Sequence, residues 1–213
     1  MTTDSLFEQL KHPNPRLRER AMWELAEARD ENTIPRLMGI LGEDDIVYRR
    51  AAVQALGAMG SDAVPPLVDS LLNSDNVTIR GSCAKALAYI ALYYPDIPFP
   101  SEGLQGLKTA LDDPNPVVHI AAVMALGEIG SSALDILIEA VKTTDNVAVA
   151  VAIANALGSM GDKRTEEVLA ALASDESADS YVRESATSAL SRLDQVSKFQ
   201  QMNNQRSQEN PTT

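Results

Sequence analysis

The sequence predicts an all-α protein in which similar helix pairs stack into a repeat solenoid. Two observations lead to this prediction. A similar stretch of about a dozen residues recurs six times, and each copy has the apolar spacing of one helix face. The copies align on six leucines separated by 31, 31, 39, 31 and 33 residues: Leu25, Leu56, Leu87, Leu126, Leu157 and Leu190. A near-constant period repeated this often is typical of a repeat array.

Each copy predicts the first helix of a pair. In the copy around Leu126, apolar residues fall at the spacing of one helix face: Val118, Ala121, Ala122, Ala125, Leu126 and Ile129. Asn or Asp stands eleven residues before every leucine, at Asn14, Asp45, Asn76, Asn115, Asn146 and Asp179. These residues are preferred N-caps because their side-chain oxygens accept backbone N–H groups. Glycine pairs predict the helix ends: Gly57 and Gly60, Gly127 and Gly130, Gly158 and Gly161.

A second helix is predicted after most of these glycines, in segments such as VPPLVDSLL and ALDILIEAV. The short segment DSLFEQLK at residues 4–11 resembles a second helix without its partner, and the copy around Leu190 closes the array. We therefore expect about five helix pairs plus terminal capping helices, forming a solenoid over residues 1–194. The polar residues 195–213 lack sustained periodicity and predict a disordered tail.

Composition limits the classes of function. The formal net charge is −12 and the pI about 4.6, so the sequence offers no basic surface for nucleic acid or an anionic membrane. The start MTTDSLFEQLKHP lacks the regions of a signal peptide, and the longest apolar run, Val147 to Ala154, is too short to span a membrane. A single cysteine, Cys83, excludes an intramolecular disulfide. We expect a soluble, cytoplasmic protein without membrane insertion or nucleic acid.

One insertion breaks the period. The spacing of 39 residues between Leu87 and Leu126 is eight more than the usual 31, and the excess lies in AYIALYYPDIPFPSEG, residues 88–103. This segment holds half of the eight Phe and Tyr residues: Tyr89, Tyr93, Tyr94 and Phe99. Repeat insertions often form binding surfaces, and tyrosines beside the Asp96 carboxylate suit a flat conjugated ligand or a partner protein. The alternative is that these aromatics fill the gap left by a longer helix.

The repeats resemble a known class. The segments DDIVYRRAAVQALGAMG (44–60), SDNVTIRGSCAKAL (74–87) and DDPNPVVHIAAVMALGEIG (112–130) resemble short HEAT-like repeats, over about residues 13–193. Together with the YYPDIPFP insertion and the acidic composition, they resemble the E/F-type phycobilin lyases, most closely the F-type subunit of the phycocyanobilin lyase for the phycocyanin α subunit.

That resemblance implies a lyase subunit that pairs with an E-type subunit as a heterodimer. The pair attaches phycocyanobilin, a substrate rather than a cofactor, to a cysteine of the apo-phycocyanin α subunit through a thioether, and it also acts in reverse. Isomerising relatives carry a His-Cys pair, whereas Ser82 precedes Cys83 in this sequence. The resemblance therefore implies the non-isomerising kind.

Bilin attachment requires cations for the propionates, a carboxylate for the pyrrole nitrogens and a proton donor. The candidate cations are Arg49, Arg50, Arg80 and Lys108. The candidate carboxylates and stacking or proton-moving residues are Asp96, Asp112, Tyr93, Tyr94 and His119. Cys83 replaces an alanine of the sister repeats, so we expect it to be a small buried residue rather than a covalent carrier.

His119 occupies a repeated position. Seven residues before the six leucines stand Arg18, Arg49, Arg80, His119, Ala150 and Arg183, which we call the arginine position. One interpretation is a polar ladder between repeats in which imidazole replaces guanidinium. The other is a site, because His119 follows the insertion directly.

Other enzyme classes lack their motifs. His12 precedes Pro13 and His119 precedes Ile120, so the His-Glu dipeptides of HEAT-like metal hydroxylases are absent and we expect no metal site. Nucleotide-binding and hydrolase motifs are absent as well. The alternative function is a non-catalytic HEAT-repeat adaptor that binds phycobilisome proteins during assembly or disassembly.

Overall fold

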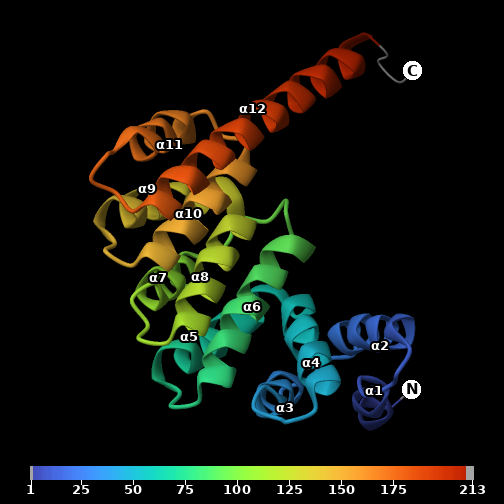
Figure 1. The fold of residues 1–213 in the computed structure, drawn as a ribbon. Coiled ribbons are helices and arrows are strands. Elements are labelled where there is room, and N and C mark those ends of the chain that lie inside the picture. The colour runs from blue at the N-terminus through green and yellow to red at the C-terminus, as the bar shows by residue number, and fades with distance from the viewer. Residues whose placement is uncertain (1, 210–213) are drawn as a thin grey trace. The chain divides into compact units, whose positions relative to one another are not determined.

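The computed structural model describes residues 2–209, except for the side chains of residue 197 and of residues 199–209. Within these residues it contains twelve α-helices, two short 3-10 helices and no strand, as Figure 1 shows. The all-α repeat prediction is confirmed.

The chain order gives five helix pairs between two terminal helices, as predicted. The first helices of the pairs are α2 (Pro15–Glu27), α4 (Ile46–Ala58), α6 (Val77–Tyr93), α8 (Pro116–Ile129) and α10 (Val147–Met160). The second helices are α3 (Thr33–Ile40), α5 (Val64–Asn73), α7 (Ser101–Ala110), α9 (Leu134–Thr143) and α11 (Arg164–Ser174). Helix α1 (Thr3–Gln9) and helix α12 (Ser180–Glu209) stand at the ends, and the 3-10 helices are η1 (Gly60–Ala63) and η2 (Gly130–Ala133).

All six predicted N-caps form. The side-chain oxygen of each accepts a backbone N–H two residues later, for example Asp45 from Val47 at 2.9 Å and Asp179 from Tyr181 at 2.8 Å. The remaining four caps are Asn14, Asn76, Asn115 and Asn146. The second glycine of each predicted pair reverses the chain, because Gly60, Gly130 and Gly161 have φ of 69°, 77° and 70°. That backbone region is easily reached only by glycine.

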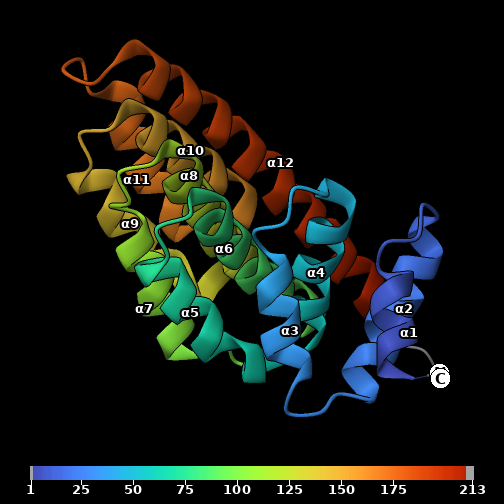
Figure 2. The same ribbon diagram turned by 90° about the horizontal axis from the view of Figure 1, so that it is seen from below.

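The chain forms two compact units, Met1–Ile129 and Gly130–Thr213. In the first unit, α4 packs between α2 and α6, α6 packs against α8, and α5 packs beside α7 (Figures 1 and 2). The anchor leucines Leu25, Leu56, Leu87 and Leu126 are all fully buried there. In the second unit, α12 packs against α10 and α11. The sequence analysis had treated residues 1–194 as one solenoid, so the division after Ile129 is a feature it did not predict.

Helix α12 continues to Glu209, well past Gln195, where the sequence predicted the start of a disordered tail. Its polar extension is rich in Gln, Arg and Lys, which favour helices, and Lys198 pairs with Asp194 one turn earlier at 2.6 Å. Residues 210–213 of the predicted tail lie outside the described residues.

Among the described residues, one helical stretch is long and apolar enough to cross a membrane, Pro116–Thr143 with mean hydropathy 1.6. Half of its apolar window is buried in the protein, and η2 interrupts it. Length and composition alone are weak evidence for a membrane span, because core helices meet the same criterion.

Candidate functional site

The insertion lengthens a helix. Helix α6 has 17 residues, against 13 in α4 and 14 in α8. It ends at Tyr93, a proline-rich turn follows, and α7 starts at Ser101. The insertion therefore adds about one helical turn and a short loop to the first unit, and its aromatic residues are divided between these two parts.

The extra turn carries a row of aromatic rings. The Tyr93 ring lies 5.1 Å from the Trp23 ring of α2 and 5.4 Å from the Tyr89 ring, measured between centroids. Because α4 packs between α2 and α6, the added turn is what allows Tyr93 to reach α2. The Tyr93 hydroxyl also lies 3.8 Å from the Met22 sulfur. Burial, with smaller contributions from Tyr89 and Glu19, raises the pKa of Tyr93 to about 12, so this phenol is protonated at neutral pH.

Tyr89 is held close to α4 by a glycine. A Cβ added to Gly57 would lie only 2.4 Å from the Tyr89 Cβ, so the two helices approach this closely only because residue 57 has no side chain. The Gln54 amide of α4 donates a hydrogen bond to the Tyr89 hydroxyl at 3.3 Å. This bond leaves the hydroxyl proton of Tyr89 free to donate elsewhere.

Tyr89 also lines a shallow apolar groove between α6 and α8, with a volume of about 320 Å³. We call it the tyrosine groove, and its lining residues are Lys85, Ala88, Tyr89, Leu92, Ala121, Met124, Ala125 and Glu128. Two large apolar side chains in it face solvent, with 51% of Leu92 and 67% of Met124 exposed. Lys85 at its edge and Arg50, one turn before Gln54 on α4, are exposed cations without an ion pair to any described residue. The groove thus joins an apolar, aromatic surface to positive charge.

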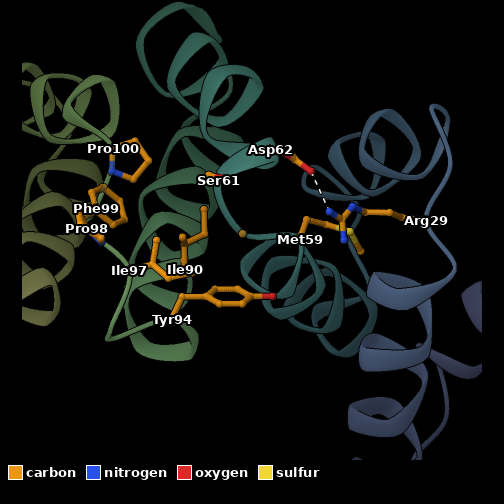
Figure 3. Close-up of a pocket in the computed structure, with 11 residues that line it drawn as sticks. Arg29, Met59, Ser61, Asp62, Ile90, Tyr94, Ile97, Pro98, Phe99 and Pro100 are labelled. Carbon is orange, nitrogen blue, oxygen red and sulfur yellow. Dashed lines mark hydrogen bonds and ion pairs between the residues drawn. The ribbon is translucent and has the colours of Figure 1, made fainter.

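The loop part of the insertion builds a second cavity, also of about 320 Å³, which we call the edge pocket. Figure 3 shows Tyr94, Ile97, Phe99 and the flanking prolines along one part of its wall and the Arg29–Asp62 ion pair, at 3.0 Å, along another. The lining residues are Arg29, Met59, Gly60, Ser61, Asp62, Ile90, Tyr94, Ile97, Pro98, Phe99 and Pro100. The Tyr94 hydroxyl donates to the Ala58 carbonyl at 2.6 Å and so ties the loop to the end of α4.

The structure divides the predicted aromatic site in two. Tyr89 and Tyr93 belong to the aromatic row, whereas Tyr94 and Phe99 line the edge pocket. Asp96 lies exposed in the turn between them, without a hydrogen-bond partner for its carboxylate among the described residues. The gap-filling interpretation holds for Tyr94, whose ring packs against Gly60.

The arginine position is part of the scaffold. The Arg80 guanidinium donates to both Asp113 carboxylate oxygens, at 2.8 and 3.1 Å, and to the Ser74 carbonyl at 2.9 Å. Arg49 donates to the Glu43 carbonyl. These cations are already engaged within the chain and lie outside the linings of both cavities. Burial by itself raises the pKa of Asp113, but the hydrogen bonds from Arg80 and from the Asn115 backbone outweigh it and bring that pKa below 3.8.

His119 is also scaffold by its contacts. Its side chain is 6% exposed, and Nδ1 lies 3.2 Å from the Asp113 carbonyl oxygen. Nε2 is buried without a hydrogen-bond partner among the described residues. The predicted ladder between repeats exists only in part, because Arg80–Asp113 crosses to the next repeat while Arg49 and His119 bond within their own loops.

The remaining candidates lie apart from both cavities. Lys108 stands in the last turn of α7, and Asp112 is exposed in the loop that follows. Cys83 is fully buried, and burial raises the pKa of its thiol to about 12, as expected for a small core residue. No group of three or more His, Cys, Asp or Glu side chains suited to a metal ion occurs in residues 2–209 with described side chains.

Sequence reasoning missed Trp23, Leu92 and Met124. Trp23 is the only tryptophan of the chain, and α8, which carries Met124, is apolar on all sides rather than on one face. A surface helix without a polar face often covers an interaction site, so this pattern was an available signal.

Known proteins share this repeat pattern. The family model of HEAT repeats matches residues 3–88 and 104–191, and the unmatched residues between them are the insertion. The chain is 56% identical over 199 residues to the uncharacterized phycocyanin operon protein Z of Pseudanabaena tenuis (strain PCC 7409), covering 93% of this chain and 98% of that protein. It is 31% identical over 168 residues to the bilin biosynthesis protein CpeZ of Synechococcus sp. (strain WH8020), covering 76% of this chain and 90% of the relative.

Solved structures are similar at the level of the fold. The complex of CpcE and CpcF of phycocyanin lyase from Nostoc sp. PCC7120 has a TM-score of 0.48 and 20% identity, over 72% of this chain and 96% of that one. A designed armadillo repeat protein has a TM-score of 0.45 and 19% identity, over 90% of this chain and all of that one.

Proposed function

This chain belongs to the HEAT-repeat bilin-biosynthesis family, and from that premise we propose that it is the F-type subunit of a heterodimeric bilin lyase. With an E-type subunit it attaches phycocyanobilin to a cysteine of the phycocyanin α subunit in the cytoplasm. The acceptor sulfur bonds to a carbon of the bilin's vinylic side chain, and the thiol proton passes to the tetrapyrrole. No atom is lost, so the same surface also serves the reverse elimination.

The tyrosine groove is the observation that supports this proposal. A tetrapyrrole is flat, largely apolar and anionic at its propionates, so its binding surface needs aromatic faces and nearby cations. The groove supplies Tyr89 and the apolar Leu92 and Met124, and the exposed Lys85 and Arg50 lie beside it. In a chain of net charge −12, two unpaired cations next to an aromatic surface are a selective feature for an anionic ligand.

The chain's own residues also bear on the chemistry. The Tyr89 hydroxyl accepts from Gln54, so its proton is available for a bilin carbonyl oxygen. Tyr93, whose pKa is about 12, holds its proton at neutral pH and supports the Tyr89 ring by contact. Cys83 is buried and its pKa is about 12, so the thiolate that attacks the bilin belongs to the acceptor protein.

The groove is open to solvent at Leu92 and Met124, which suits a partner subunit closing over the bilin. The edge pocket favours a second candidate function, a non-catalytic adaptor. Its apolar wall beside the Arg29–Asp62 pair suits a protein segment rather than a pigment, because the ion pair already satisfies the charges at its mouth.

Reconstitution tests the proposal. The chain, its E-type partner, the apo-phycocyanin α subunit and phycocyanobilin should together give a covalent, fluorescent adduct on the α subunit. Tyr89→Ala should lower the adduct yield at least tenfold, because it removes the aromatic wall. Tyr181→Ala is the matched control, since this α12 tyrosine is 69% exposed and lies outside the groove.

Two results would contradict the proposal. Equal yields for both variants would exclude the tyrosine groove as the bilin surface. Absence of adduct with the native chain, together with tight binding to assembled phycobilisomes, would favour the adaptor.

A further inference from the structure

The arginine position makes one recurring contact. In five of its six copies the side chain bonds a backbone carbonyl six or seven residues earlier, in the loop that precedes its own helix. The pairs are Arg18 with His12, Arg49 with Glu43, Arg80 with Ser74, His119 with Asp113, and Arg183 with Glu176. The sixth copy is Ala150 in α10, whose methyl group cannot donate.

The loop before Ala150 nevertheless has the geometry of the loop before Arg80. Thr144 has φ −74° and ψ 134°, and Ser74 has φ −73° and ψ 133°. In both loops the hydroxyl accepts the backbone N–H of the asparagine cap at 3.2 Å. The Thr144 carbonyl is therefore directed relative to its helix as the Ser74 carbonyl is, and that orientation allows Ser74 to accept from Arg80.

The acidic partner of Arg80 also has a counterpart. Asp113 follows Arg80 by 33 residues, of which eight belong to the insertion, and Asp175 follows Ala150 by 25. Both aspartates accept the backbone N–H two residues later, Asp113 from Asn115 at 2.8 Å and Asp175 from Ser177 at 2.9 Å. The hydrogen bonds from Ser177 lower the pKa of Asp175, so its carboxylate is ionised at neutral pH.

A cavity of about 510 Å³ lies between these groups. Thr144, Ala150 and Asp175 all line it, together with the carboxylates of Asp145 and Asp179. Lys142 is the one cation in the lining. The walls also include apolar side chains such as Val168 and Leu172, which suit the methylene stem of a long side chain.

From this geometry we propose that the cavity beside Ala150 binds an arginine side chain of a partner protein. The guanidinium donates to the Thr144 carbonyl and to the Asp175 carboxylate, the two groups whose counterparts in the Arg80 repeat bind Arg80 itself. Arginine fits better than lysine, because its planar fork of N–H donors reaches a carbonyl and a carboxylate together. A bare metal ion would leave the apolar walls uncovered.

Binding of a defined probe provides the first test. Nα-acetyl-arginine amide, titrated into the ¹⁵N-labelled full chain, should shift the amide resonances of residues 144–150 and 175–179 saturably, in the millimolar range. Nα-acetyl-citrulline amide has nearly the same shape without the charge and should shift them at least tenfold less. Equal responses to the two probes would overturn the proposal, as would shifts confined to other regions.

Variants then test the site and its source of arginine. Ala150→Arg should place a guanidinium in the cavity from within the chain, abolish the response to the probe and weaken association with the E-type partner at least tenfold. Ala148→Arg adds the same charge at an exposed position of α10 and should change neither. Asp175→Asn should weaken probe binding without adding bulk, which covers the case in which Ala150→Arg folds poorly.

Probe binding that Ala150→Arg removes, with unchanged partner affinity, would refute a protein arginine as the ligand. The identity of the partner rests on the proposed lyase function. None of these measurements depends on bilin attachment, so the failure of either proposal is distinguishable from failure of the other.

Discussion

Replacing Gly57 with alanine tests how the tyrosine groove is built. Gly57 is the next-to-last residue of α4, and an added Cβ would lie 2.4 Å from the Tyr89 Cβ and 3.2 to 3.3 Å from its backbone carbon atoms. The backbone atoms cannot rotate away, so α6 has to move away from α4. We expect Gly57→Ala to destabilise the first unit and to displace Tyr89 from its contact with Gln54.

Two opposing effects set the magnitude. Alanine in place of a helical glycine gains up to about 1 kcal/mol in helix propensity. Overpacking of a close contact costs about 1–3 kcal/mol, and the upper end applies because backbone atoms are involved. Gly39→Ala is a matched control, since Gly39 is also the next-to-last residue of its helix and no atom lies within 4 Å of its added Cβ. The two variants should therefore differ by about 3 kcal/mol.

Thermal and urea unfolding, followed by circular dichroism, measure this difference. At the roughly 2–4 °C per kcal/mol typical of a chain of this size, the Tm of Gly57→Ala should lie about 6–12 °C below that of Gly39→Ala. Phycocyanobilin should also quench Trp23 fluorescence less in Gly57→Ala, since the aromatic row is disturbed. Equal midpoints for the two variants would refute the close-approach argument.

Three further outcomes follow from the described contacts. Asp113→Asn should cost roughly 3 kcal/mol, because it breaks a pair with Arg80 whose side chains are only 12% and 9% exposed. The pKa of Asp113 is lowered on folding, so its contribution to stability is present above its unfolded pKa and is lost as pH falls through the folded value; urea titrations should show a shallower acid limb in the variant, and an unchanged limb would contradict this sign. Cys83→Ala should leave adduct formation unchanged, and the native thiol should resist alkylation at neutral pH by mass spectrometry, whereas a bilin found on Cys83 would refute its core role. Tyr94→Phe should lower the unfolding free energy by about 1–2 kcal/mol through loss of the bond to Ala58, while leaving bilin binding by the tyrosine groove intact; a selective loss of that binding would join the two cavities functionally.

The sequence predicted the features that local chemistry determines. All six N-caps and the five helix pairs were predictable, because an Asx cap and an apolar spacing act over a few neighbouring residues. The position of the insertion was predictable from the period. The contact partners of the arginine position were not, because a ladder between repeats and a cap on the preceding loop give the same spacing.

The site depends on distances that a sequence does not encode directly. Tyr93 and Tyr94 are adjacent in sequence, yet one meets Trp23 of α2 and the other turns toward the end of α4. The tyrosine groove depends on Gly57, which looked only like a helix end and proved to set the spacing of α4 and α6. The helical residues after Gln195 show the reverse case, in which polar composition suggested a tail although the residues are good helix formers.

The placement of the insertion has a consequence for the entropy of binding. Tyr89 and Tyr93 stand one turn apart on α6, and their rings are restrained by Gln54, Trp23 and each other. An aromatic surface on a flexible loop would lose conformational freedom each time a ligand bound, whereas rings already ordered on a helix lose little. Growth of α6 by one turn thus produced a preorganised surface, and calorimetry should find a small conformational-entropy loss when a flat ligand binds.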